Sequence, residues 1–122
     1  MERTEIENAI TEHFGVQPER PFARDQSIVV FRHPENRKWF GVVMTIAKSK
    51  LGIPADGKID IINLKCAPEM LDSLWQNDGI YPAYHMNRGH WITAALDGRL
   101  SPDTLTFLLR VSFELTLPHK KA

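Results

Sequence analysis

Three side chains in the sequence are of the types that perform nucleophilic or metal chemistry, namely Cys66, His85 and His90. A neighbouring histidine would lower the pKa of the Cys66 thiol and make it a nucleophile. We favour another interpretation, because a lone cysteine at the end of an apolar strand is usually a small buried hydrophobic residue. The motifs of phosphate loops, dinucleotide sites, zinc proteases and serine hydrolases are absent. We therefore expect no catalytic residue and no enzymatic activity.

The spacing of His85 and His90 raises the question of a metal site. With a two-residue turn at Asn87 and Arg88, the histidines would stand opposite each other and could share a metal ion. With a three-residue turn they would point to opposite faces of the sheet. Two histidines without a nearby carboxylate make a poor site, so we predict neither metal nor cofactor.

Positive charge is concentrated in the middle of a chain that is neutral as a whole, with 15 Lys and Arg against 15 Asp and Glu. Neutrality excludes a polycation that coats nucleic acid. Residues 20–65 nevertheless carry nine bases and four acids, whereas residues 1–19 carry one base and five acids. Such bases could contact DNA phosphates, or they could only solubilise loops and protect sheet edges. The candidate nucleic-acid-binding residues are Arg32, Arg37, Lys38, Lys48, Lys50, Lys58, Asn87, Arg88 and His90.

Helices and strands alternate along the chain and must position these residues. Thr4 and Glu7 have the spacing of a capping box, which predicts a helix from there to Gly15. β-Branched and aromatic runs predict three strands, and Pro68 begins a short helix. Two further strands would form a hairpin around Asn87–Gly89, and Ser101 with Pro102 would begin the last helix. The predicted strands are residues 28–31, 39–46, 58–66, 81–86 and 90–96.

This order, α-βββ-α-ββ-α, predicts the fold class. Strands joined by short turns form an antiparallel sheet, and amphipathic helices cover one face of it. We expect a single two-layer α+β domain over residues 1–122, with a sheet of about five strands. The other sheet face would remain open, and Tyr84 or Trp91 on that face could stack on an exposed base.

Three features of the sequence indicate the cellular compartment. One cysteine permits no intrachain disulfide, and the acidic N-terminal segment has no apolar signal core. No stretch approaches the ~20 apolar residues that span a bilayer. We expect a cytoplasmic protein without membrane contact, monomeric, with a frayed tail at residues 119–122.

Three segments carry a resemblance to a known family: NLKCAPEMLDSLW at residues 63–75, IYPAYHMNRGHWITAALDG at 80–98 and LLRVSFELT at 108–116. In these segments the chain resembles the MmcQ/YjbR family of small bacterial proteins. The resemblance implies a CyaY-like α+β fold and no enzymatic activity. It also implies a proposed DNA-binding role in which hairpins project as a double wing. The family's signature hairpin would comprise Tyr84, His85, Asn87, Arg88, His90 and Trp91.

Two functional hypotheses follow. The first is a DNA-binding module whose basic turns contact the phosphate backbone with little sequence readout. The second is a non-enzymatic scaffold that binds a protein or a small ligand on the open sheet face. They differ in whether the cations of the middle segment and the last hairpin converge on one surface. If these cations scatter, the scaffold hypothesis is favoured.

Overall fold

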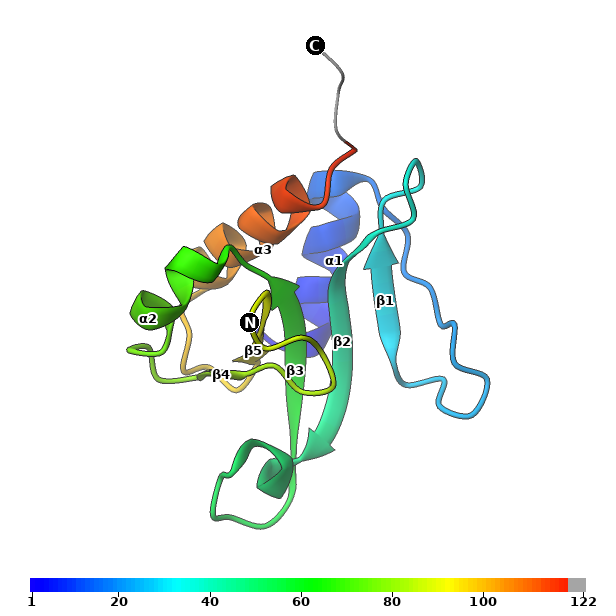
Figure 1. Cartoon of the computed structure of the whole chain (residues 1–122). Coiled ribbons are helices and arrows are strands. Elements are labelled where there is room, and N and C mark those ends of the chain that lie inside the picture. Colours follow the sequence, from blue (N-terminus) through cyan, green and yellow to red (C-terminus); the bar gives the residue numbers. More distant parts are fainter. Residues whose placement is uncertain (119–122) are drawn as a thin grey trace.

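The structure is a computed structural model that describes residues 1–118, and it confirms the two-layer α+β fold (Figure 1). The helices lie against one face of a single sheet of five strands. The strands are β1 (Val29–Arg32), β2 (Trp39–Ala47), β3 (Lys58–Lys65), β4 (Ile80–Pro82) and β5 (Trp91–Ala95). The α-helices are α1 (Arg3–Phe14), α2 (Leu71–Leu74) and α3 (Pro102–Leu115), and the 3-10 helices are η1 (Lys48–Leu51) and η2 (Pro68–Met70).

The sheet is antiparallel throughout, in the order β1-β2-β3-β5-β4. The first three strands form the predicted meander, in which Val43 of β2 pairs with Val29 of β1 and Ile62 of β3. Consecutive turns of an antiparallel meander lie at opposite ends of the sheet. The β1–β2 turn and the β2–β3 connection are therefore separated by the length of β2 (Figure 1).

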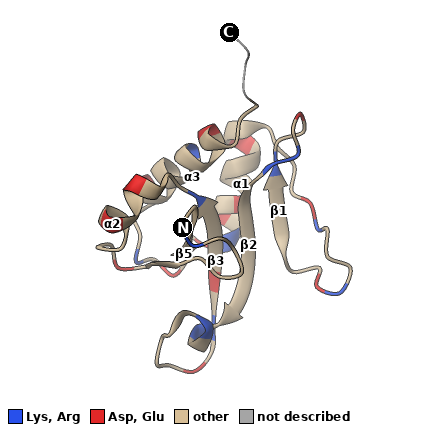
Figure 2. Cartoon of the chain, in the orientation of Figure 1, with Lys and Arg blue, Asp and Glu red and all other residues tan. Residues whose placement is uncertain are grey.

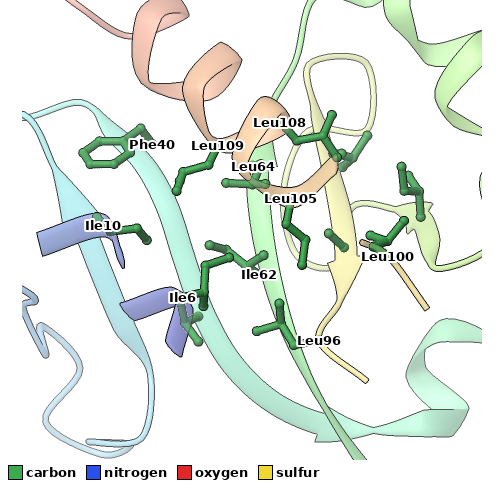
Figure 3. Close-up of a cluster of buried hydrophobic side chains, with 14 of the residues drawn as sticks. Ile6, Ile10, Phe40, Ile62, Leu64, Leu96, Leu100, Leu105, Leu108 and Leu109 are labelled. Carbon is green, nitrogen blue, oxygen red and sulfur yellow. The ribbon is translucent and has the colours of Figure 1, made fainter. Parts of the chain in front are cut away.

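The main core lies between the sheet and the two long helices. Ile6 and Ile10 of α1 are fully buried, and Leu105, Leu108 and Leu109 project from α3 at helical spacing (Figure 3). These side chains pack on Phe40, Ile62 and Leu64 of the sheet. Burial of a large apolar side chain stabilises the fold by about 1.5–3 kcal/mol, so this layer fixes which sheet face the helices cover.

The caps that the sequence predicts for the long helices agree with the structure, except for the cap at the start of α1. The helix α1 begins at Arg3, and its capping box consists of Glu2 and Glu5, so the predicted box of Thr4 and Glu7 is wrong by two positions. Both boxes have the same spacing, and the earlier one satisfies the backbone donors of the turn that actually forms. Gly15 ends α1 at φ 66°, and Ser101 caps α3 by accepting a hydrogen bond from the amide of Thr104 at 3.1 Å.

Among the described residues, no α-helix lies on the second sheet face, and we call it the helix-free face. A smaller apolar cluster lies on this face: Val30, Val42, Met44, Ile46, Ile59, Ile61 and Ala95. Tyr81, Tyr84, Trp39 and residues of the β2–β3 connection pack against it. Loops and the short helix η1 therefore cover part of the face that the sequence analysis left open.

The predicted second hairpin is wrong in its shape. The strand expected at residues 81–86 stops at Pro82, and β5 begins at Trp91 rather than His90. Two backbone features prevent the strand from continuing, because Pro82 has no amide to donate and His85 has φ 59° in the left-handed region. Residues 83–90 instead form a loop that crosses in front of β3 in Figure 1.

Two further expectations from the sequence concern membrane-spanning segments and the C-terminal tail. None of the helices within residues 1–118 combines the length and apolar character needed to cross a bilayer. The predicted frayed tail at residues 119–122 lies outside the described residues.

A buried histidine joins the β1–β2 turn to the end of α3. Nε2 of His33 lies 3.1 Å from the carbonyl oxygen of Phe113 and 2.8 Å from Oγ1 of Thr116. The ring also packs against Phe40 and Phe113. Burial lowers the pKa of His33, while the hydrogen bond to Phe113 and the charge of Glu35 oppose that shift.

We predict that the free energy of unfolding falls as the pH is lowered from about 7.5 to about 5.5. In this window the unfolded chain takes up a proton on His33 more readily than the folded chain, so acid favours unfolding. Urea denaturation at several pH values measures the effect. The decrease should be smaller in His33→Gln and unchanged in the control His13→Gln, which alters an exposed histidine. Equal pH dependence in all three proteins would contradict this account.

Candidate functional site

A buried polar cluster fixes the loop of residues 83–90 on the helix-free face. Asn63 of β3 and Thr93 of β5 are paired across the sheet, and both are completely buried. The Asn63 amide donates a hydrogen bond to the carbonyl of Tyr84 at 3.0 Å, and Oγ1 of Thr93 accepts one from the Tyr84 amide at 2.9 Å. The Thr93 hydroxyl also donates to Oδ1 of Asn63. Both backbone groups of Tyr84 are thus held over the middle of the sheet.

The fixed loop forms one side of a groove of about 390 Å³, which we call the face groove. Tyr84, His85 and Met86 line it from residues 83–90, and Phe22 lines it from the loop before β1. Its remaining lining residues are Asp25, Ile28, Trp39, Val42, Met44, Thr45, Ile46, Ala47 and Lys50. The side chains of β2 form an apolar floor beneath aromatic walls. Tyr84 therefore does lie on the helix-free face, as one alternative of the sequence analysis required.

The aromatic side chains of the face groove occur in two perpendicular pairs. The rings of Phe22 and Trp39 meet edge to face, with centroids 6.1 Å apart and an interplanar angle of 89°. The rings of Tyr84 and His85 have the same angle and centroids 4.1 Å apart. Perpendicular pairs are a favourable aromatic geometry, so these walls hold their shape while Phe22 and His85 remain exposed.

The face groove has two charged lining residues, Asp25 and Lys50. Hydrogen bonds from the hydroxyl and amide of Ser27 are the main cause that lowers the pKa of Asp25, and the charges of Arg3 and Lys58 add to them. Lys50 is exposed, and it forms no ion pair with any residue that the structure describes.

The basic residues of the meander do not gather on one surface. Arg37 and Lys38 lie in the β1–β2 turn at one end of the sheet, whereas Lys48, Lys50 and Lys58 lie at the other end (Figure 2). Asp56 also interrupts the positive charge of the second group, because it lies in the same connection as the lysines. By the criterion stated above, this distribution favours the scaffold hypothesis.

Arg32 is held by a carboxylate within the chain. Its Nε and Nη2 atoms each lie 2.7 Å from a carboxylate oxygen of Glu19, in a bidentate pair. This pair lowers the pKa of Glu19, with a further contribution from the nearby charge of Arg37. The guanidinium of Arg32 is thus engaged in the folded chain, and it is a poor candidate for a phosphate contact.

The remaining predicted residues, Asn87, Arg88 and His90, are exposed at the end of the loop that leads into β5. The Asn87 carbonyl accepts hydrogen bonds from the amides of His90 and Trp91, which forms a turn. Because β5 runs antiparallel to β3, this turn lies at the same end of the sheet as Arg37 and Lys38. His90 is not on a strand, so the proposed opposition of His85 and His90 in a two-residue hairpin is wrong.

Cys66 lies in the helix-side core and is almost completely buried. Burial raises the pKa of its thiol, which disfavours the nucleophilic thiolate. Its amide donates a hydrogen bond to the carbonyl of His90, yet the imidazole of His90 is exposed. Within residues 1–118, no three His, Cys, Asp or Glu side chains are grouped as metal ligands would be.

Comparison with known proteins places the chain in a family. The family model described as YjbR matches residues 12–115. The chain belongs to the YjbR family. The uncharacterized protein YyaQ of Bacillus subtilis strain 168 is 38% identical over 117 residues, which cover 95% of this chain and 98% of YyaQ. The uncharacterized protein YjbR of Escherichia coli K12 is 33% identical over 64 residues, or 49% of this chain and 54% of that protein.

Solved structures of related proteins have the same fold. A crystal structure of a Pseudomonas syringae protein, 39% identical, superposes with a TM-score of 0.94 and covers 96% of this chain and all of the other. A Deinococcus radiodurans protein with a DUF419 domain is 27% identical and has a TM-score of 0.57, with 82% of this chain and 67% of that protein covered. The YjbR assignment made from the sequence is thereby confirmed.

Sequence reasoning missed the residues that form the face groove in this YjbR chain. Asn63 could have indicated that a further segment packs on the sheet. It is the one amide side chain within the apolar run IINL of β3. A polar residue in a strand that is buried on both faces requires a partner. Phe22 and Met86 carried no such signal, since their role depends on how two loops approach the same sheet face.

We predict that Asn63→Ala lowers the free energy of unfolding by about 1–3 kcal/mol, because it leaves the Tyr84 carbonyl and the Thr93 hydroxyl without their partner. Hydrogen exchange at the Tyr84 amide should accelerate more than exchange in β2. Denaturant unfolding and amide exchange measure both effects. The matched control Asn8→Ala changes an exposed asparagine of α1 and should alter neither. Unchanged exchange at Tyr84 would contradict the anchoring role.

Proposed function

We propose that this YjbR protein is a non-enzymatic binding module that holds a small organic ligand in the face groove. The observation that carries the proposal is a groove of about 390 Å³ with an apolar floor and aromatic walls on the helix-free face. Small-molecule sites are typically concave, largely apolar and about 300–1,000 Å³ in volume. A groove of this size suits a small molecule better than a folded partner.

The rigidity of the walls supports the same proposal. The loop that carries Tyr84, His85 and Met86 is held by hydrogen bonds to Asn63 and Thr93 in the middle of the sheet. A groove that exists before the ligand arrives costs little ordering on binding. The left-handed backbone of His85 adds a second indication, because sparsely populated conformations are retained where surrounding structure enforces them, often at binding sites.

A second, smaller cavity of about 230 Å³ lies between α1 and α3, lined by side chains such as Met1, His13 and Leu109. It lacks the opposed aromatic walls of the face groove, since Phe14 is its one aromatic ring besides the imidazole of His13. A third cavity, of about 430 Å³, lies beside the β1–β2 turn, and the imidazole of His33 is the one aromatic ring in its lining. We therefore assign the ligand to the face groove.

We predict that the neutral probe 1-naphthalenemethanol shifts amide resonances of residues that line the face groove. Phe22→Ala removes one aromatic wall and should weaken binding by about threefold to tenfold, as expected for loss of one stacking contact. The matched control Phe107→Ala should bind like the wild type, because Phe107 is 56% exposed on α3 and lies outside the groove. NMR titration of the three proteins gives the affinities. Equal weakening by both substitutions, or shifts confined to α1 and α3, would refute the assignment.

DNA binding through a double wing is the second candidate function. The position of two basic loops at one end of the sheet favours it. The β1–β2 turn with Arg37 and Lys38 and the β4–β5 loop with Arg88 lie at the same end of the sheet, toward its two edges. Among residues 1–118, neither Lys38 nor Arg88 takes part in an ion pair. Two basic projections on either side of a sheet end could contact phosphates on both sides of a DNA groove.

We predict that any DNA binding of this kind is weak and depends steeply on salt. For each phosphate contacted, the logarithm of the association constant should fall by about 0.9 for every tenfold increase in salt concentration. Lys38→Gln and Arg88→Gln should each reduce that slope by about one contact. Lys58→Gln, at the opposite end of the sheet, is the control and should leave the slope unchanged. Electrophoretic shift assays from about 50 to 200 mM salt measure the slope. No binding at the lowest salt would exclude this candidate.

A further inference from the structure

We propose that the ligand of the face groove is a planar organic anion, with its aromatic body on the apolar floor and its anionic group at Lys50. This inference rests on the proposed function and specifies the class of ligand. It follows from three properties of the lining: the balance of its charges, the orientation of its rings and the position of Lys50 relative to the floor.

Two cations outside the lining act on its acidic member. Asp25 and Lys50 are its charged members, and their formal charges cancel. The carboxylate of Asp25, however, already accepts hydrogen bonds from the amide and hydroxyl of Ser27. The cations Arg3 and Lys58 also act on this carboxylate. A ligand ammonium at Asp25 would be repelled by these two cations.

Lys50 has no ion-pair partner among the described residues. It projects from η1, directly after β2, and no carboxylate within residues 1–118 lies within ion-pair distance of it. An ammonium at the edge of an apolar groove attracts an anion, and the partly apolar surroundings screen this attraction less than bulk water does. The uncompensated charge of the face groove therefore selects for an anionic ligand.

The rings select for a flat ligand body. The Phe22–Trp39 and Tyr84–His85 pairs are both perpendicular, and all four rings line the groove. Flat aromatic molecules can meet ring faces by offset stacking and ring edges by edge-to-face contact. The methionines Met44 and Met86 in the same lining adapt to irregular shapes and make favourable contacts with aromatic rings.

Three probes that share one aromatic body test the inference: 1-naphthoate, 1-naphthalenemethanol and 1-naphthylmethylamine. We expect the anion to bind about threefold tighter than the neutral alcohol, as expected for one exposed charge pair. The amine should bind no tighter than the alcohol. The preference for the anion should disappear in Lys50→Gln and persist in Lys38→Gln, which removes an equal charge from an exposed position outside the lining, at the other end of the sheet. It should also decrease at high salt.

The outcomes separate this inference from the proposed function. Equal affinity for all three probes, tightest binding of the amine, or an anion preference that survives Lys50→Gln would overturn the inference and leave the binding groove intact. If none of the three probes shifts the resonances of the lining residues, both the inference and the proposed function are overturned. Both lysine variants change exposed side chains, so their folding can be verified from unchanged amide spectra elsewhere.

Discussion

The side chain of Asn63 is completely buried at the centre of β3, and an unpaired amide in that place would cost about 1–3 kcal/mol. It finds its partners in Thr93 on the adjacent strand and in the backbone of Tyr84. The loop of residues 83–90 must therefore lie across the sheet, because it supplies the carbonyl that this amide requires. The face groove owes its Tyr84–His85 wall to this hydrogen-bonding requirement inside the sheet.

The two faces of the sheet have different roles: one carries the main core and the other carries the face groove. On the helix side, α1 and α3 bury a continuous layer of aliphatic and aromatic side chains, and this layer provides most of the apolar burial. On the other side, a smaller apolar cluster is covered only where loops reach it. A sheet face that is apolar, concave and incompletely covered can accept a ligand without disturbing the main core. The basic end formed by the β1–β2 turn and the β4–β5 loop is a separate surface.

The sequence allowed most of the fold to be predicted, because β2 and β3 are long β-branched runs and α3 has a clear cap and a 3.6-residue period. It also allowed the family to be recognised from residues 63–75, 80–98 and 108–116. The start of α1 was misplaced because Glu2 with Glu5 and Thr4 with Glu7 have the same capping spacing. The loop of residues 83–90 was mistaken for a strand because its course depends on Asn63 and Thr93, which are distant in sequence. The separation of the basic turns, in contrast, already followed from the predicted meander, in which consecutive turns alternate between sheet ends.

A crystal structure of the protein with 1-naphthoate would show where the ligand binds, because the described residues form other cavities besides the face groove. We expect the naphthalene ring between the Phe22–Trp39 pair and Tyr84, above Met44, with its carboxylate directed toward Lys50. A naphthoate bound between α1 and α3, or one in the face groove with its carboxylate turned away from Lys50, would contradict the account.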